Sequence, residues 1–167
     1  MADSNSHRSE KKQKVVEVLN KAREMELYAI HQYMNHHYTL DDEDYGELAS
    51  KMRSISIDEM RHAEWLAERI KDLDGEPSSK MDGTVMKGQA VRDMYSFDRD
   101  LEDDTLVKYH EFLKVCRECD DYVSANIFER LIIQEQEHWD YFDDTDNHIK
   151  ELGDHFMGRM AASGEAD

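Results

Sequence analysis

The chain has 167 residues, 36% of them charged, and its formal net charge is −18 at pH 7. Binding to nucleic acid or to an acidic membrane surface is not expected, because contacts to phosphates need basic patches. No run approaches 18 apolar residues and the N-terminus lacks the apolar stretch of a secretion signal, so we expect no membrane span and a cytoplasmic protein. Two cysteines indicate a reducing compartment without a disulfide framework.

A single proline and seven glycines, mostly outside the periodic stretches, favour an all-α fold. The length suits one domain with a proper core. We therefore expect a single domain over residues 1–167, with flexible residues 1–10 and a flexible tail at 162–167.

Two long helices are predicted in the first half of the chain. The first spans about Lys11 to Tyr38, and its apolar stripe carries Glu26 where a core residue should lie. The second spans about Glu47 to Leu73, and its stripe carries Glu59 and His62 in the same central position. An acidic turn separates the two helices.

A long connection and two further helices follow. Ser78 to about Gln89 has no helical period, and at about 3.4 Å per residue it could span roughly 40 Å, the length of a 27-residue helix. Such a crossover carries the chain from one end of a bundle to the other. The third helix is predicted over about Val91 to Cys119 and the fourth over about Tyr122 to Glu151, with a short fifth helix from Asp154 to about Ala161.

The third helix carries Glu102 on its inward face, and the fourth carries Glu135 and His138. Residues three apart share a helix face, so each Glu-x-x-His pair points a carboxylate and an imidazole in one direction. Each of the four inward stripes thus has a carboxylate near its middle. Buried carboxylates are costly unless they are paired or metal-bound, which favours a metal site over a core with a few buried ion pairs.

These ligands suit iron or manganese, because they offer many oxygens and one imidazole per metal, whereas a structural zinc site would recruit the cysteines. Two Glu-x-x-His helices with one Glu from each of two further helices are the ligand set of carboxylate-bridged di-iron bundles. The expected reaction is oxidation of Fe²⁺ and not hydrolysis, since no nucleophile presents itself.

At this point the sequence resembles the bacterioferritins, and most closely those of anaerobic sulfate-reducing bacteria. The resemblance covers nearly the whole chain and includes a Met between the ligands of the second helix. Its most specific stretches are residues 26–33, residues 57–64, residues 121–124 and residues 135–138.

The resemblance implies a role for each candidate ligand. Glu26 and His62 would be terminal ligands of one iron, Glu102 and His138 of the other, and Glu59 and Glu135 would bridge the two. Family members are hollow 24-subunit shells, built from dimers, that oxidise Fe²⁺ with O₂ or H₂O₂ and store the ferric mineral. The electron donor for iron release would be a small ferredoxin or rubredoxin.

Met60 points away from the bundle core, 100° around the helix from Glu59. In the family this outward Met, paired with its symmetry mate across a two-fold interface, is the axial ligand of a heme or related iron porphyrin. From the residue alone, a Met packing at an interface is the simpler reading. The resemblance to bacterioferritins favours the heme ligand over the packing residue.

Two positions depart from the pattern of some bacterioferritins. Ser54 replaces an inner-surface His, and Tyr141 replaces a Trp. Tyr33 matches a family tyrosine near the di-iron centre, although an ordinary half-buried aromatic explains it equally well. Cys116 and Cys119 are expected to be core residues, because they lie late in a helix, away from a thiolate-stabilising N-terminus.

Two other classes of protein share parts of this pattern. A rubrerythrin-type oxidase or peroxidase would act without storing iron. It is expected to carry an appended rubredoxin domain, which is not found in this sequence. A DNA-protecting mini-ferritin places iron between subunits and would not need two Glu-x-x-His pairs in one bundle. The remaining histidines, such as His36 and His37, have no Glu three residues before them and are expected to be surface or hydrogen-bonded residues.

Overall fold

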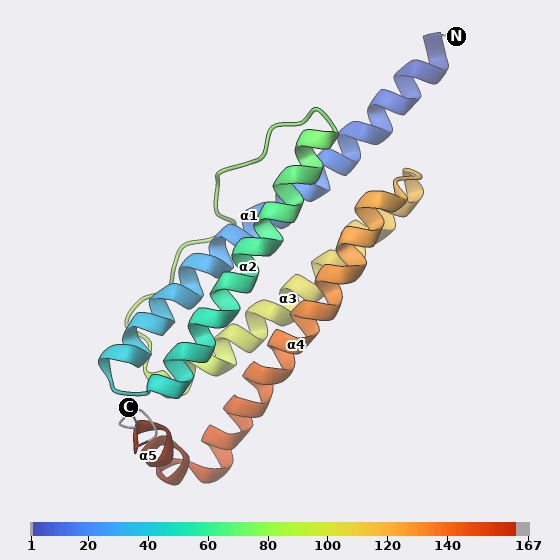
Figure 1. Cartoon of the computed structure of the whole chain (residues 1–167). Helices are drawn as coiled ribbons and strands as arrows, with labels where there is room; N and C mark the ends of the chain where they lie inside the picture. The colour runs from blue at the N-terminus through green and yellow to red at the C-terminus, as the bar shows by residue number, and fades with distance from the viewer. Residues whose placement is uncertain (1, 163–167) are drawn as a thin grey trace.

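The computed structural model describes residues 2–162 as a bundle of four long helices with a short fifth helix at one end (Figure 1). No strand occurs in this part of the chain, so the predicted all-α bundle of four long helices with a short fifth helix is confirmed. The helices are α1 (Ala2–Asp42), α2 (Gly46–Asp72), α3 (Val91–Glu118), α4 (Tyr122–Leu152) and α5 (Asp154–Ala162).

The predicted boundaries of α2 to α5 agree with the structure within one residue, whereas α1 is longer than expected at both ends. It begins at Ala2 and not near Lys11, and its N-terminal part projects beyond the other helices (Figure 1). The residues before Lys11 are polar and show no apolar stripe, but no Pro or Gly among them interrupts a helix. The flexibility expected for residues 1–10 stays a prediction, and residues 163–167 of the expected tail lie outside the described residues.

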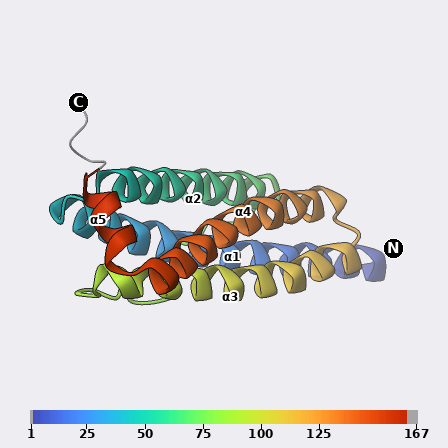
Figure 2. The ribbon, with the colours of Figure 1, turned by 90° about the horizontal axis from the view of Figure 1, so that it is seen from below.

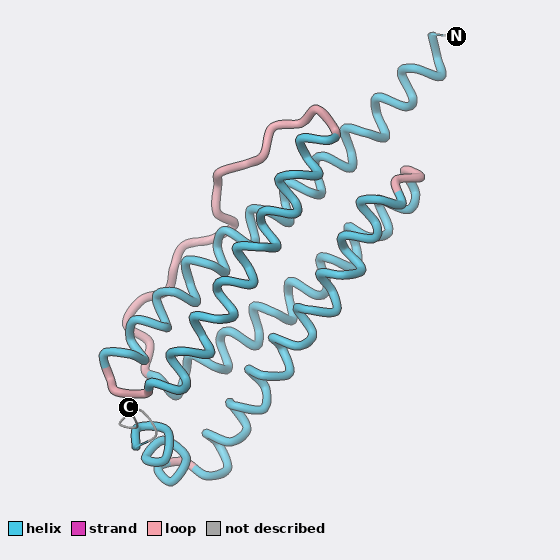
Figure 3. Tube along the Cα trace, viewed as in Figure 1, coloured by secondary structure: helices cyan, strands magenta, loops and turns pink. Residues whose placement is uncertain are grey.

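The crossover between α2 and α3 runs along α1 and returns the chain to the other end of the bundle (Figure 3). Its first part is fixed by Arg23, which donates to the Ser78 carbonyl at 2.9 Å, and by Ser78, whose amide donates to Asn20 Oδ1 at 2.7 Å. Its later part is held by Gln32, which both donates to and accepts from the backbone of Met86. The predicted long crossover is confirmed, and α2 and α3 consequently run in the same direction (Figure 2).

Short turns join α1 to α2 and α3 to α4, and each of these two turns contains an Asp with a left-handed backbone. Asp44, which precedes α2, has φ +63°, and Asp120, which precedes α4, has φ +61°, a conformation that Asp tolerates better than most residues. Asp121 then caps α4 by accepting the backbone N–H of Ser124 at 2.9 Å. Gly153, at φ +52°, separates α4 from α5, as the sequence predicts.

The apolar core consists of two clusters of buried side chains. One surrounds Tyr33, Tyr95 and Phe142, and the other surrounds Tyr109 and Phe128. Along every long helix, the residues of one cluster are separated from those of the other by the predicted carboxylates. A buried polar layer therefore crosses the middle of the bundle.

Candidate metal centre

All six predicted ligands lie in this polar layer, and each has at most 7% of its surface exposed. They form two overlapping groups whose ligand atoms lie within 4.8 Å of one another. The first group is Glu26, Glu59, His62 and Glu135, and the second is Glu59, Glu102, Glu135 and His138. Glu59 and Glu135 belong to both groups, so the arrangement has the form of a two-metal site with two shared carboxylates.

The two imidazoles face the shared carboxylates through the same ring atom. Nδ1 of His62 lies 2.8 Å from Glu59 and 2.9 Å from Glu135, and Nδ1 of His138 lies 2.9 Å from Glu59 and 3.1 Å from Glu135. The two rings stack with their centroids 5.9 Å apart. Each Nδ1 therefore contacts two carboxylates at once, as it would contact a cation bound between them.

The shared carboxylates have more acceptor capacity than the protein satisfies. Oε1 of Glu59 and Oε1 of Glu135 are buried and have no hydrogen-bond donor among the described residues, although an imidazole nitrogen lies 2.9 Å from each. Buried oxygens of this kind are costly unless a cation or a donor binds them. The donor set therefore fits hard or borderline metal ions that accept carboxylate and imidazole ligands.

Burial and neighbouring charges shift the pKa values of the carboxyl groups in this layer in different directions. Burial and the nearby charges of Glu135 and Glu59 raise the pKa of Glu26 and of Glu102 well above the usual range. Burial alone would also raise the pKa of Glu59, but the two imidazolium groups hold it low. In the absence of metal, the layer is thus a mixture of neutral carboxyls, carboxylates and imidazolium ions.

The pKa of both histidines is raised because the attraction of the carboxylates exceeds the cost of burial. Burial lowers the pKa of His138, but the charge of Glu59 and the hydrogen bonds of Glu135 and Glu59 raise it to about 11. The pKa of His62 is raised by Glu135 and Glu26 in the same way. Metal ions would take the place of these protons, because a metal ligand must be deprotonated at the donor atom.

The side chains that orient the ligands come from distant parts of the sequence. The hydroxyl of Tyr33 donates to Glu102, and the hydroxyl of Tyr109 donates to Glu26. Nε2 of His62 lies 2.6 Å from Oε1 of Gln134, the position in which a metal-bound imidazole commonly donates its second N–H. No motif in the sequence marks Gln134 or predicts the bond of Tyr109; the only signal is the place of Tyr109 on the inward stripe of α3.

Met60 does not belong to this layer. It is 49% exposed on α2 and lies in a surface pocket of about 710 Å³ whose apolar walls include Leu27, Ile30 and Ile57. Arg23 and Arg61 also line the pocket. The predicted outward direction of Met60 is therefore confirmed.

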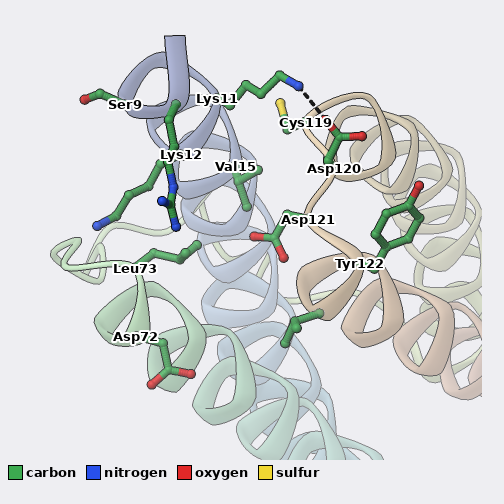
Figure 4. Close-up of a pocket in the computed structure, with 12 residues that line it drawn as sticks. Ser9, Lys11, Lys12, Val15, Asp72, Leu73, Cys119, Asp120, Asp121 and Tyr122 are labelled. Atoms are coloured by element: carbon green, nitrogen blue, oxygen red, sulfur yellow. Dashed lines mark hydrogen bonds and ion pairs between the residues drawn. The ribbon is translucent and has the colours of Figure 1, made fainter. Parts of the chain in front are cut away.

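A second pocket, of about 800 Å³, lies at the end of the bundle where α1 emerges (Figure 4). Lys11 bridges it by an ion pair with Asp120 at 2.5 Å, and Cys119 lies beside this pair. Cys116 is fully buried in the core, as predicted, whereas Cys119 is half-buried. Neither of the metal-ligand groups found among the described residues contains a cysteine.

None of the described helices is long and apolar enough to cross a membrane.

Comparison with known proteins gives a consistent relationship. The family model of the ferritin-like domain matches residues 16–152. The bacterioferritin of Desulfovibrio desulfuricans is 56% identical over 157 residues, which cover 94% of this chain and 88% of the relative. The bacterioferritin of Streptomyces coelicolor is 38% identical over 140 residues, 84% of each chain.

Solved structures of bacterioferritins also match this chain. An X-ray structure of the Desulfovibrio desulfuricans bacterioferritin, which describes its diiron site in different catalytic states, matches with a TM-score of 0.91 and 57% identity over 92% of this chain and 90% of that one. The Mycobacterium tuberculosis bacterioferritin BfrA matches with a TM-score of 0.83 and 34% identity over 91% of this chain and 94% of that one. This chain therefore belongs to the bacterioferritin family of ferritin-like proteins.

Proposed function

We propose that this protein is a ferroxidase and iron-storage protein, which oxidises Fe²⁺ to Fe³⁺ in the polar layer and stores the ferric product in an oligomeric shell. The observation that carries the proposal is the pair of buried ligand groups that share Glu59 and Glu135. The family relationship supports it, because the Desulfovibrio desulfuricans relative has a diiron site.

The ligand roles follow from the two groups. Glu26 and His62 belong to the first group alone, and Glu102 and His138 to the second alone, so these four side chains are the proposed terminal ligands. Four carboxylates together balance the charge of two ferrous ions. The di-iron pair, when bound, supplies two electrons to O₂ or H₂O₂.

The protein's own contribution is to fix the ligands and to exclude water. Tyr33 and Tyr109 hold the carboxyls of Glu102 and Glu26 by hydrogen bonds, and Gln134 holds the ring of His62. Apolar clusters close the layer on both sides along the bundle. Carboxylate ligands tolerate both oxidation states of iron, since they are hard oxygen donors.

Stopped-flow oxidation of Fe²⁺ by the assembled protein tests the site. Glu135→Gln should slow the rapid phase by more than about 100-fold, because it removes a carboxylate shared by both ions. Glu137→Gln is the matched control, since Glu137 is exposed on the same helix two residues away. Equal rates for the two variants would refute the site.

Oligomeric storage distinguishes this proposal from the rubrerythrin-type alternative. We propose a shell of 24 subunits built from dimers, which at 19.7 kDa per chain corresponds to about 470 kDa. Val107, Tyr122 and Ile133 are each more than half exposed, which supports an assembly that covers apolar surface. Size-exclusion chromatography distinguishes the two, because a dimer in place of the shell would favour the rubrerythrin-type alternative.

We also propose that Met60 is the axial ligand of a heme or related iron porphyrin bound between two subunits. The exposed thioether and the apolar walls of its pocket fit a flat apolar group, and Arg23 and Arg61 fit its carboxylates. Met60→Leu should remove the Soret band of the purified protein. Met86→Leu, at a crossover position of equal 49% exposure, should leave the band intact.

The remaining parts of the proposal come from the family relationship. A small ferredoxin or rubredoxin would supply electrons for iron release, and the protein would act in the cytoplasm. The chain would form one ferritin-like di-iron domain over residues 1–167.

A further inference from the structure

A second buried ionisable pair lies outside the metal layer and takes no part in the proposed ligand set. It consists of His36 on α1 and Asp98 on α3, both with no exposed surface. Nδ1 of His36 lies 2.8 Å from Oδ2 of Asp98. Moving such a pair from water into a core costs free energy, which the contacts around the pair must offset.

The other ring nitrogen of His36 lies between two glutamine side chains. Nε2 is 2.7 Å from Oε1 of Gln89, in the crossover immediately before α3, and 2.8 Å from Nε2 of Gln32, on α1. One neighbour is thus an acceptor and the other a donor. A single ring nitrogen cannot satisfy both at the same time.

The orientation of Gln32 is fixed by the crossover backbone. Its Oε1 accepts the N–H of Met86 at 2.8 Å, and its Nε2 donates to the carbonyl of Met86 at 3.1 Å. The second N–H of Gln32 therefore points a donor at His36 in every protonation state. Among the described residues, no hydrogen bond of this kind anchors Gln89 to the backbone. Gly88 before it has φ +75°, and no atom lies within 4 Å of the place that a Cβ would occupy there.

The charge of His36 consequently selects its partner. Nδ1 carries a proton in both states, because it faces the Asp98 carboxylate. Charged His36 also has an Nε2–H and donates to Gln89. Neutral His36 presents a lone pair at Nε2, which accepts from Gln32 and repels Oε1 of Gln89.

We propose that His36 is a protonation switch: when charged it ties Gln89, and with it the end of the crossover, residues 84–90, to the bundle, and when neutral it loosens this segment, which Gln32 still holds at Met86. Charged His36 bonds Asp98 on α3 and Gln89 in the crossover, and so ties these two elements to α1. Deprotonation removes the tie to Gln89 alone.

The surroundings of His36 stabilise its charged form relative to a histidine in water. Burial lowers its pKa, but the hydrogen bond and charge of Asp98 outweigh burial, and the net result is a raised pKa. Asp98 is the charged group that bonds His36. Its uncharged neighbours are Gln32 on α1, Gln89 in the crossover and Phe97 on α3, whose ring centroid lies 6.1 Å from that of His36 in an edge-on arrangement. No side chain of α2 or α4 bonds His36 among the described residues.

Hydrogen exchange of the assembled, metal-free protein between pH 6 and 9.5 tests the switch, after correction for intrinsic exchange. Residues 84–90 should exchange about tenfold faster above the titration of His36, because one charge-assisted bond is lost. Residues 76–82 are the internal reference, since Asn20, Arg23 and the Glu24 backbone hold them without a histidine. Identical pH dependence of the two segments would overturn the proposal.

Variants separate a switch from a simple anchor. His36→Gln should abolish the pH dependence of residues 84–90, whereas His31→Gln, a matched change at an exposed position of α1, should retain it. Asp98→Asn should move the midpoint to lower pH, because the carboxylate no longer stabilises the charged ring. A simple anchoring role would change the level of exchange in these variants but not its midpoint.

Size-exclusion chromatography shows first which variants assemble. If His36→Gln does not assemble, Asp98→Asn and Gln89→Leu decide between the two roles. Gln89→Leu, which has no acceptor, should keep residues 84–90 in the fast-exchanging state at every pH. A midpoint unchanged by Asp98→Asn, or protection retained in Gln89→Leu, would refute the switch.

Discussion

The hydroxyl of Tyr33 offers a direct measurement of how the polar layer is held in place. Tyr33 is fully buried and donates to Oε1 of Glu102, whose carboxyl is itself only 2% exposed. Tyr33→Phe removes the donor without changing the shape of the ring. The carboxyl oxygen then stays buried without this partner, which costs about 2 kcal/mol.

That cost translates into a measurable shift in melting temperature. A chain of this length loses about 2 to 4 °C per kcal/mol, so Tyr33→Phe should lower the melting temperature of the metal-free protein by about 4 to 8 °C. Scanning calorimetry at a fixed protein concentration and scan rate measures the shift. Tyr109→Phe should behave alike, since its hydroxyl donates to the buried Glu26.

Tyr38→Phe is the matched control, because Tyr38 is 63% exposed on the same helix as Tyr33. It should shift the melting temperature by less than about 1 °C. A shift for Tyr33→Phe no larger than that of Tyr38→Phe would refute the reasoning, since it would mean that water replaces the lost donor in the layer.

Further measurements test the same structure. Adding Co²⁺ at about 100 times its dissociation constant should stabilise the protein by about 2.7 kcal/mol per site, and EDTA should reverse the rise in melting temperature; no rise would contradict a preformed metal site. Phe128→Ala should cost about 3 to 5 kcal/mol in denaturant unfolding, because Phe128 is fully buried; a cost below 1 kcal/mol would contradict the packing. Iodoacetamide should label Cys119 and spare Cys116 at pH 8, since burial raises the pKa of Cys116 to about 12; peptide mass spectrometry reads the result, and equal labelling would contradict the burial of Cys116.

The pH dependence of stability gives a further test, and its sign follows from the shift. The pKa of His138 is raised from 6.5 to about 11, so the folded metal-free protein holds a proton that the unfolded chain has lost. Its contribution is fully present below pH 6.5 and disappears as the pH rises through about 11. Melting temperatures should therefore fall between pH 7 and 10, and a rise over this range would contradict the ion pairs of the layer.

Much of this architecture could be predicted because helical periodicity is a local property. The 3.6-residue repeat places Glu26, Glu59 and Glu102 on inward faces and turns Met60 outward, and the structure confirms these directions. A crossover without helical period and a glycine after α4 are equally visible in the sequence. Local pattern alone therefore predicted the number of helices and the faces that carry the ligands.

Contacts between residues far apart in the chain could not be predicted from the sequence. Tyr109 and Glu26 are 83 residues apart, and His36 and Asp98 are 62 apart, so no spacing rule pairs them. The length of α1 was also mispredicted, because its polar N-terminal turns carry no apolar stripe. Helical periodicity predicted the six candidate ligand positions. The packing of the four helices places Glu59 and Glu135 in both candidate ligand groups, because this depends on how the helices face one another and not on the pattern along any one of them.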